Sequence, residues 1–169
     1  MAIQEQINME EIHYLTKELK KYYTNDFESL LSFKGSEFWD IDDGLVDILK
    51  QINLITEVQT LYSKRYKPNQ EYLTTQTDSY LEITFTREFE PELISRLSKL
   101  KAEFTCNNAV LTFSVQNPLN NVNVKPESKI LLGCTTNPNY FMIRHIKIEL
   151  DSENLECHDI FWEKLKEIF

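Results

Sequence analysis

The densest group of residues that could do chemistry is an acidic cluster that follows Trp39. Its carboxylates belong to Asp40, Asp42, Asp43 and Asp47. Carboxylates so close together could bind a cation, and the EF-hand loop is the nearest template. That loop needs glycine at its sixth position and glutamate at its twelfth. Counted from Asp40, Gly44 is fifth and Gln51 is twelfth, so we predict no metal site.

Two interpretations of the acidic cluster follow from its place before an apolar stripe. The carboxylates can stabilise a helix N-terminus, where the helix dipole favours negative charge. They can also form a partner-binding patch, because the cluster adjoins two aromatic residues and tryptophan is enriched at binding hot spots. Asp43 and Asp47 are four residues apart, so they share one helix face. The candidate partner-binding residues are Phe38, Trp39, Asp40, Asp42, Asp43 and Asp47.

The other groups that could act in catalysis are scattered along the chain. Three histidines show no metal-ligand spacing, and no serine lies in a nucleophile-elbow motif. Glu82 and Glu149 fall on predicted strands and could converge with His145 as an acid–base pair. Polar outer faces of strands supply such residues without any catalytic role, so we expect no catalytic residue and no cofactor.

Tyrosines are concentrated in the first half of the sequence. They include Tyr22, Tyr23, Tyr62, Tyr66, Tyr72 and Tyr80. Tyrosine offers a large contact area at a modest cost in entropy, which favours a binding surface. The alternative is amphipathic packing along the edge of a sheet.

The cysteines Cys106, Cys134 and Cys157 form no close pair, and their number is odd. This pattern is not typical of a disulfide framework, so we expect free thiols in a reducing, cytoplasmic setting. His158 follows Cys157 directly, but neighbouring helix residues point about 100° apart. We therefore do not expect a cysteine nucleophile.

Composition and charge exclude several classes of protein. The 169 residues are 41% hydrophobic, which is too apolar for a disordered chain, and no apolar run reaches the roughly 18 residues of a membrane span. Three glycines are too few for a glycine-rich phosphate loop. The net charge of −9 disfavours direct nucleic-acid binding.

The acidic residues are concentrated at the two ends of the sequence. Residues 1–53 carry 11 acids and 5 bases, and residues 151–169 carry 6 acids and 2 bases. The acidic ends suit a partner with a basic surface. Solubility alone is the alternative explanation.

Apolar periodicity predicts the elements that must position these residues. A period near 3.6 predicts helices at 8–23, 25–34, 42–53, 90–102 and 154–168. Alternation predicts strands at 55–66, 79–88, 103–115, 128–136 and 140–150. We also predict a two-residue turn at Asn107–Asn108 and a bulge near His145, where the apolar phase slips by one residue.

The sequence therefore predicts an α+β fold in one domain, residues 1–169. Residues 1–53 form a helical part, and residues 54–169 form an antiparallel sheet of five to six strands with one inserted and one C-terminal helix. The functional hypothesis is a non-enzymatic protein that binds another protein, such as an immunity or antitoxin-type inhibitor or a small escort chaperone; a homodimer is compatible with it. The alternatives are a small enzyme or ligand-binding protein with a pocket between sheet and helices, and a structural subunit of a larger assembly.

Overall fold

The computed structural model describes residues 14–32, 44–68, 77–116 and 143–169. These residues form four helices and one antiparallel sheet of four strands, which confirms the α+β class. In chain order the elements are α2 (Lys17–Ser32), α3 (Val46–Asn53), β1 (Val58–Lys64), β2 (Asp78–Phe85), α4 (Glu90–Glu103), β3 (Ala109–Gln116), β4 (His145–Ser152) and α6 (Leu155–Ile168). The prediction of five to six strands differs from this sheet, and the strand predicted at 128–136 lies outside the described residues.

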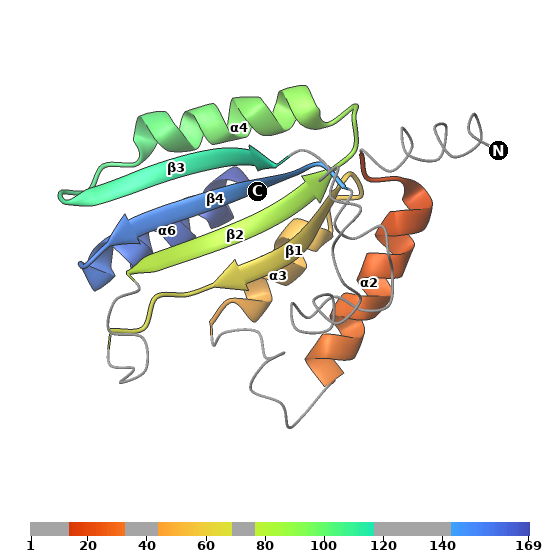
Figure 1. The fold of residues 1–169 in the computed structure, drawn as a ribbon, viewed down its shortest axis with the longest axis horizontal. Coiled ribbons are helices and arrows are strands. Elements are labelled where there is room, and N and C mark those ends of the chain that lie inside the picture. The colour runs from red at the N-terminus through yellow and green to blue at the C-terminus, as the bar shows by residue number, and fades with distance from the viewer. Residues whose placement is uncertain (1–13, 33–43, 69–76, 117–142) are drawn as a thin grey trace, which may run out of the picture.

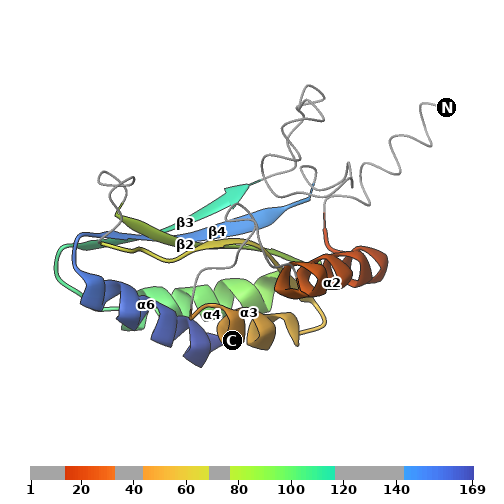
Figure 2. The same cartoon turned by 90° about the horizontal axis from the view of Figure 1, so that it is seen from below.

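The strand order is β1-β2-β4-β3, so the last strand of the chain is inserted between β2 and β3. The helices α3, α4 and α6 cover one face of the sheet, and α2 lies beside β1 (Figures 1 and 2). The core lies between the sheet and these three helices. It is built from alternate strand residues, including Leu81 and Ile83 opposite Ile148 and Ile146.

The helix α2, the first element of the described residues, is continuous where we predicted a break near Asn25. Tyr23 and Phe27 are both buried, and their spacing of four residues places them on one helix face. Packing of that face outweighs the capping tendency of Asn25. The N-terminus of α2 is instead capped by Thr16, whose hydroxyl accepts a hydrogen bond from the Leu19 N–H at 3.2 Å.

Two local predictions about the strands need correction. The bulge lies in β1 between Thr60 and Tyr62, whereas the pairing of β4 is continuous from His145 onward. The apolar phase slips because Ile143 precedes the strand and packs in a separate small cluster. Asn108 does adopt the left-handed conformation, with φ of 59°, but it connects α4 to β3 and not two strands.

Cys106 and Cys157 form a disulfide, which contradicts the expectation of free thiols for these two residues, while Cys134 lies outside the described residues. Their Cα atoms are 5.8 Å apart, within the usual range for a disulfide. The bond joins the loop after α4 to the first turn of α6. The two cysteines are 51 residues apart in sequence, so only the packing of α6 beside α4 brings them together. The prediction of a reducing, cytoplasmic setting was based on free thiols, so the disulfide removes that support.

Candidate functional site: the polar face of the sheet

The predicted partner-binding residues fall largely outside the described part of the chain. Phe38, Trp39, Asp40, Asp42 and Asp43 all lie in the segment 33–43, which is not described. Asp47 lies in the first turn of α3 and is exposed, while Ile48 and Leu49 are buried. The outward orientation expected for Asp47 is therefore observed, and the acidic patch itself stays a prediction.

A second group of charged residues is assembled on the sheet face opposite α3, α4 and α6. We call this group the polar face. It comprises Tyr62 and Lys64 of β1, Asp78, Tyr80 and Glu82 of β2, and His145, Lys147, Glu149 and Asp151 of β4. They alternate with inward-facing residues, as Glu82 lies between the buried Leu81 and Ile83, because strand side chains alternate between faces.

Strand register sets which of these residues are neighbours. Glu82 lies opposite Lys147, and Tyr80 lies opposite Glu149. Glu82 and Glu149 are thus diagonal neighbours, at a separation that long side chains can span. His145 is two residues from Lys147 on the same face. The structure therefore brings together the three residues that we considered for acid–base chemistry.

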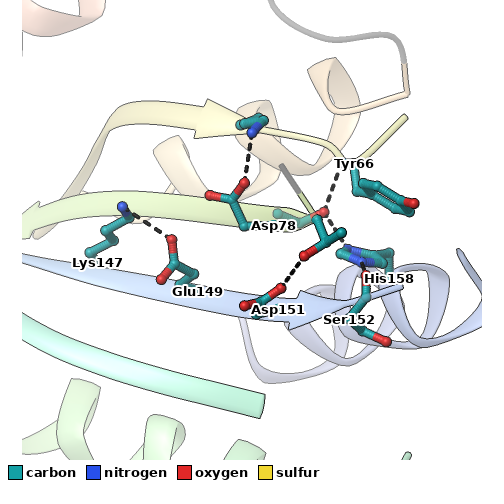
Figure 3. Close-up of polar contacts among 10 residues, drawn as sticks. Tyr66, Asp78, Lys147, Glu149, Asp151, Ser152 and His158 are labelled. Atoms are coloured by element: carbon teal, nitrogen blue, oxygen red, sulfur yellow. Dashed lines mark hydrogen bonds and ion pairs between the residues drawn. The ribbon is translucent and has the colours of Figure 1, made fainter. Parts of the chain in front are cut away.

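Ion pairs and a ring contact connect the polar face. The Lys64 Nζ lies 2.7 Å from Asp78 Oδ1, and the Lys147 Nζ lies 3.2 Å from Glu149 Oε2 (Figure 3). The same Lys147 ammonium lies 4.5 Å from the centre of the Tyr80 ring, which is a cation–π geometry. At the end of the face, the Thr77 hydroxyl donates to Asp151. Four carboxylates against two lysines give the face a net charge of 2 − 4 = −2, without counting His145.

The carboxylates of the polar face differ in how well their charge is compensated. Burial raises the pKa of Glu82, and the charge of Glu149 adds to this, while His145 and Lys147 oppose it. Burial also acts to raise the pKa of Asp78, but the hydrogen bond and charge of Lys64 outweigh it, so that pKa is lowered. Asp78 is a compensated anion, whereas the negative charge of Glu82 is disfavoured by its surroundings.

A buried polar cluster lies behind one end of this face. His158 of α6 is fully buried, with Nδ1 2.7 Å from the Ser79 Oγ and Nε2 2.7 Å from the Ser152 carbonyl oxygen. A carbonyl can only accept, so Nε2 carries the proton and Nδ1 accepts from the Ser79 hydroxyl. The Tyr66 N–H donates to the same Ser79 oxygen at 2.9 Å, and the Tyr66 ring lies against the imidazole (Figure 3).

This serine–histidine pair resembles the start of a catalytic triad, but its surroundings indicate a structural role. Ser79 is fully buried, so a substrate cannot reach its oxygen. The pair instead ties α6 to β2 and to the end of β4. Sequence analysis missed it because 79 residues separate Ser79 from His158; the available signal was a serine in the inward phase of an otherwise apolar strand.

Comparison with protein-family models, with curated proteins and with solved structures finds no match to this chain. Among the helices of the described residues, none combines the length and the apolar character that crossing a membrane requires. Within the same residues, no group of three or more histidine, cysteine or acidic side chains is arranged to hold a metal ion.

Proposed function

We propose that this chain is a non-enzymatic protein that binds a basic segment of another protein through its polar face. The observation that carries the proposal is the convergence of four carboxylates and two tyrosines from three strands. Inhibitors of the immunity or antitoxin type and small escort chaperones are the forms of binding protein that such a surface suits. Complementary charge would speed the encounter with a basic partner.

The polar face offers matched groups for arginine or lysine side chains. Arginine can form two parallel hydrogen bonds with a carboxylate and can stack on an aromatic ring. Tyr62 and Tyr80 provide rings, and Glu149 and Asp151 provide acceptors near them. The Glu149 side chain is 32% exposed, so one side of its carboxylate is accessible to a partner. Lys147 lies 4.5 Å from the centre of the Tyr80 ring, so the chain itself already places a cation against a tyrosine of this face.

Glu82 supports a binding role because its ionised form is disfavoured in the chain alone. Its pKa is raised by burial, so at neutral pH the carboxylate is a source of instability. A partner cation beside Glu82 would compensate that charge. Replacement by the neutral isostere in Glu82→Gln should therefore preserve or raise the stability of the chain at pH 7, while weakening its binding. Such opposition between stability and activity is typical of functional sites.

The test uses a short peptide rich in lysine and arginine and, as control, a glutamate-rich peptide of equal length. Fluorescence anisotropy at about 50 mM and about 300 mM salt measures affinity and its salt dependence. We expect the wild type to bind only the basic peptide. The double variant Glu82→Gln/Glu149→Gln should bind the basic peptide about tenfold more weakly, and its affinity should depend less on salt.

The matched control is Glu163→Gln/Glu167→Gln, which removes two exposed carboxylates from α6. It changes the net charge by the same amount and should alter the affinity less than about twofold. An equal loss in both double variants would mean that the chain attracts cations by its net charge alone, and the polar face would not be the site.

The second candidate function is acid–base catalysis or small-ligand binding by Glu82, His145 and Glu149. One observation favours it, namely the raised pKa of Glu82, since perturbed carboxyl groups are common at active sites. Absence of binding to both peptides by the wild type would contradict the basic-segment proposal and favour this candidate.

A further inference from the structure

Three of the four carboxylates on the polar face have a polar partner within the chain (Figure 3). The pairs are Lys64–Asp78, Lys147–Glu149 and Thr77–Asp151. The fourth carboxylate, that of Glu82, makes no hydrogen bond or ion pair with any residue of the described ranges. Its side chain is half-buried, so water compensates its charge only in part. Glu82 is therefore the carboxylate of this face that gains most from an added cation.

The nearest cation of the chain itself is bound elsewhere on the face. Lys147 lies directly opposite Glu82 in the strand register. Its Nζ, however, lies 3.2 Å from Glu149 Oε2 and 4.5 Å from the centre of the Tyr80 ring. The Lys147 charge favours ionisation of Glu82 from a distance, without a direct contact. Both Glu82 oxygens therefore remain acceptors without a donor in the described part of the chain.

An aromatic ring lies on the other side of Glu82. Tyr62 of β1 is directly opposite Glu82, and the Cβ atoms of such cross-strand pairs are about 4.5–5.5 Å apart. The bulge between Thr60 and Tyr62 creates this pairing, because Thr60 is opposite Ile83 and a regular strand would place Leu61 beside Glu82. Bulges are common next to functional sites, where they redirect a side chain.

A ring beside a carboxylate with two open oxygens matches the chemistry of a guanidinium group. The planar guanidinium of arginine can donate two parallel hydrogen bonds to one carboxylate while its face stacks on an aromatic ring. It is also more weakly hydrated than an ammonium, so it loses less solvation when it enters a half-buried position. Lysine carries a compact, strongly hydrated charge and cannot make the paired contact. The surroundings of Glu82 therefore favour arginine over lysine.

We propose that Glu82 and Tyr62 form a binding site for an arginine side chain of the partner, with the guanidinium bound to both Glu82 oxygens and stacked on the Tyr62 ring. The site rests on the proposed function, because it specifies which basic residue the polar face recognises. Lys147 keeps its contacts with Glu149 and Tyr80, and the arginine supplies the direct counter-ion of Glu82. The partner segment is thus selected for arginine and not for positive charge alone.

The test compares two peptides of equal length and charge, one with arginine and one with lysine at every basic position. Fluorescence anisotropy measures the affinity of the full chain for each peptide. We expect the wild type to bind the arginine peptide about tenfold more tightly than the lysine peptide. Glu82→Gln should reduce this preference to about twofold or less.

The matched control is Asp151→Asn, which removes the same charge from the same face. Asp151 accepts from the Thr77 hydroxyl and pairs with no lysine among the described residues, so its loss releases no competing cation toward Glu82. Asp151→Asn should weaken the binding of both peptides equally and keep the preference for arginine. Equal losses of preference in Glu82→Gln and Asp151→Asn would assign the preference to the charge of the whole face and overturn the site.

The Tyr62 ring is tested by a pair of variants. Tyr62→Leu should lower the preference for the arginine peptide, whereas Tyr62→Phe keeps the ring and should retain it. Circular dichroism of each variant checks the fold. If Tyr62→Leu unfolds, the comparison of Glu82→Gln with Asp151→Asn decides the outcome. A folded Tyr62→Leu chain with the full preference would overturn the site as proposed.

Failure of the arginine site and failure of the proposed function give different results. If the wild type binds neither peptide, the polar face does not bind basic segments, and both proposals are wrong. If the wild type binds both peptides with equal affinity, or if Glu82→Gln keeps the wild-type preference, the arginine site is wrong while binding of basic segments stands.

Discussion

At the scale of single residues, His158 makes the stability of the protein depend on pH. Burial lowers its pKa, against the opposing effects of the Ser152 carbonyl and of Asp151, Asp159 and Asp78. The folded chain therefore holds a neutral imidazole at pH values where the unfolded chain, with a pKa near 6.5, takes up a proton. The protonated unfolded state is favoured as the pH falls, so the stability is complete above 6.5 and declines below it.

We expect the free energy of unfolding to fall by up to about 1.4 kcal/mol per pH unit below pH 6.5, until the folded pKa is reached. Urea denaturation between pH 7.5 and 5.5 measures this slope. The variant His158→Gln should lose this part of the slope and should be less stable at pH 7.5 by about 1–3 kcal/mol, because the Ser79 and Ser152 groups lose good partners. If the free energy of unfolding of the wild type had the same slope against pH as that of His158→Gln, His158 would not be the cause of the pH dependence.

At the scale of elements, the disulfide fastens α6 to the loop after α4. Because the two cysteines are 51 residues apart in sequence, the bond removes entropy from the unfolded chain that corresponds to about 4 kcal/mol of stability. We expect Cys106→Ala/Cys157→Ala to melt roughly 10 °C below the wild type. Reduction of the wild type should have a similar effect. Intact mass under non-reducing conditions checks the bond directly; a mass equal to that of the reduced chain would contradict it.

The Glu90 carboxylate joins the first and last described segments to the start of α4 through a hydrogen bond and an ion pair. The Tyr14 hydroxyl donates to Glu90 Oε2 at 2.8 Å, and the Arg144 guanidinium lies 2.7 Å from Glu90 Oε1. The Tyr14 and Arg144 contacts lower the pKa of Glu90 although burial acts to raise it. One carboxylate therefore holds Tyr14, three residues before α2, and Arg144, directly before β4, so it helps to fix the positions of both elements relative to α4.

At the scale of the whole molecule, charge opposes compactness. Acids exceed bases by 27 − 18 = 9 in the full chain, so self-repulsion destabilises the folded state at low ionic strength. We expect the midpoint of urea unfolding at pH 7 to rise when salt increases from about 10 mM to about 300 mM, because screening shortens the range of the repulsion. The same increase in salt should raise the unfolding midpoint less near pH 5, where the net charge of the chain approaches zero. A midpoint that falls with salt at pH 7 would show that local ion pairs dominate.

The sequence by itself determined the class of fold and most of its elements. Alternation in Leu81, Ile83 and Phe85 predicts β2, and the 3.6-residue period of Leu93, Leu97 and Leu100 predicts α4, because burial of one face imposes these periods on any strand or helix. Both elements are observed with bounds within a few residues of the predicted ones. The same local pattern was misleading at Asn25, where the continuous packing of α2 overrode a capping signal.

Only the tertiary structure decided which distant residues meet. Glu82 and Lys147 become neighbours because β4 is inserted beside β2, and no local pattern specifies strand order or register. The Cys106–Cys157 bond and the Ser79–His158 pair likewise depend on how α6 packs. Short-range periodicity records which face of an element is buried, but pairing between strands is set by the packing of the whole core. For that reason the polar face emerges only from the assembled sheet.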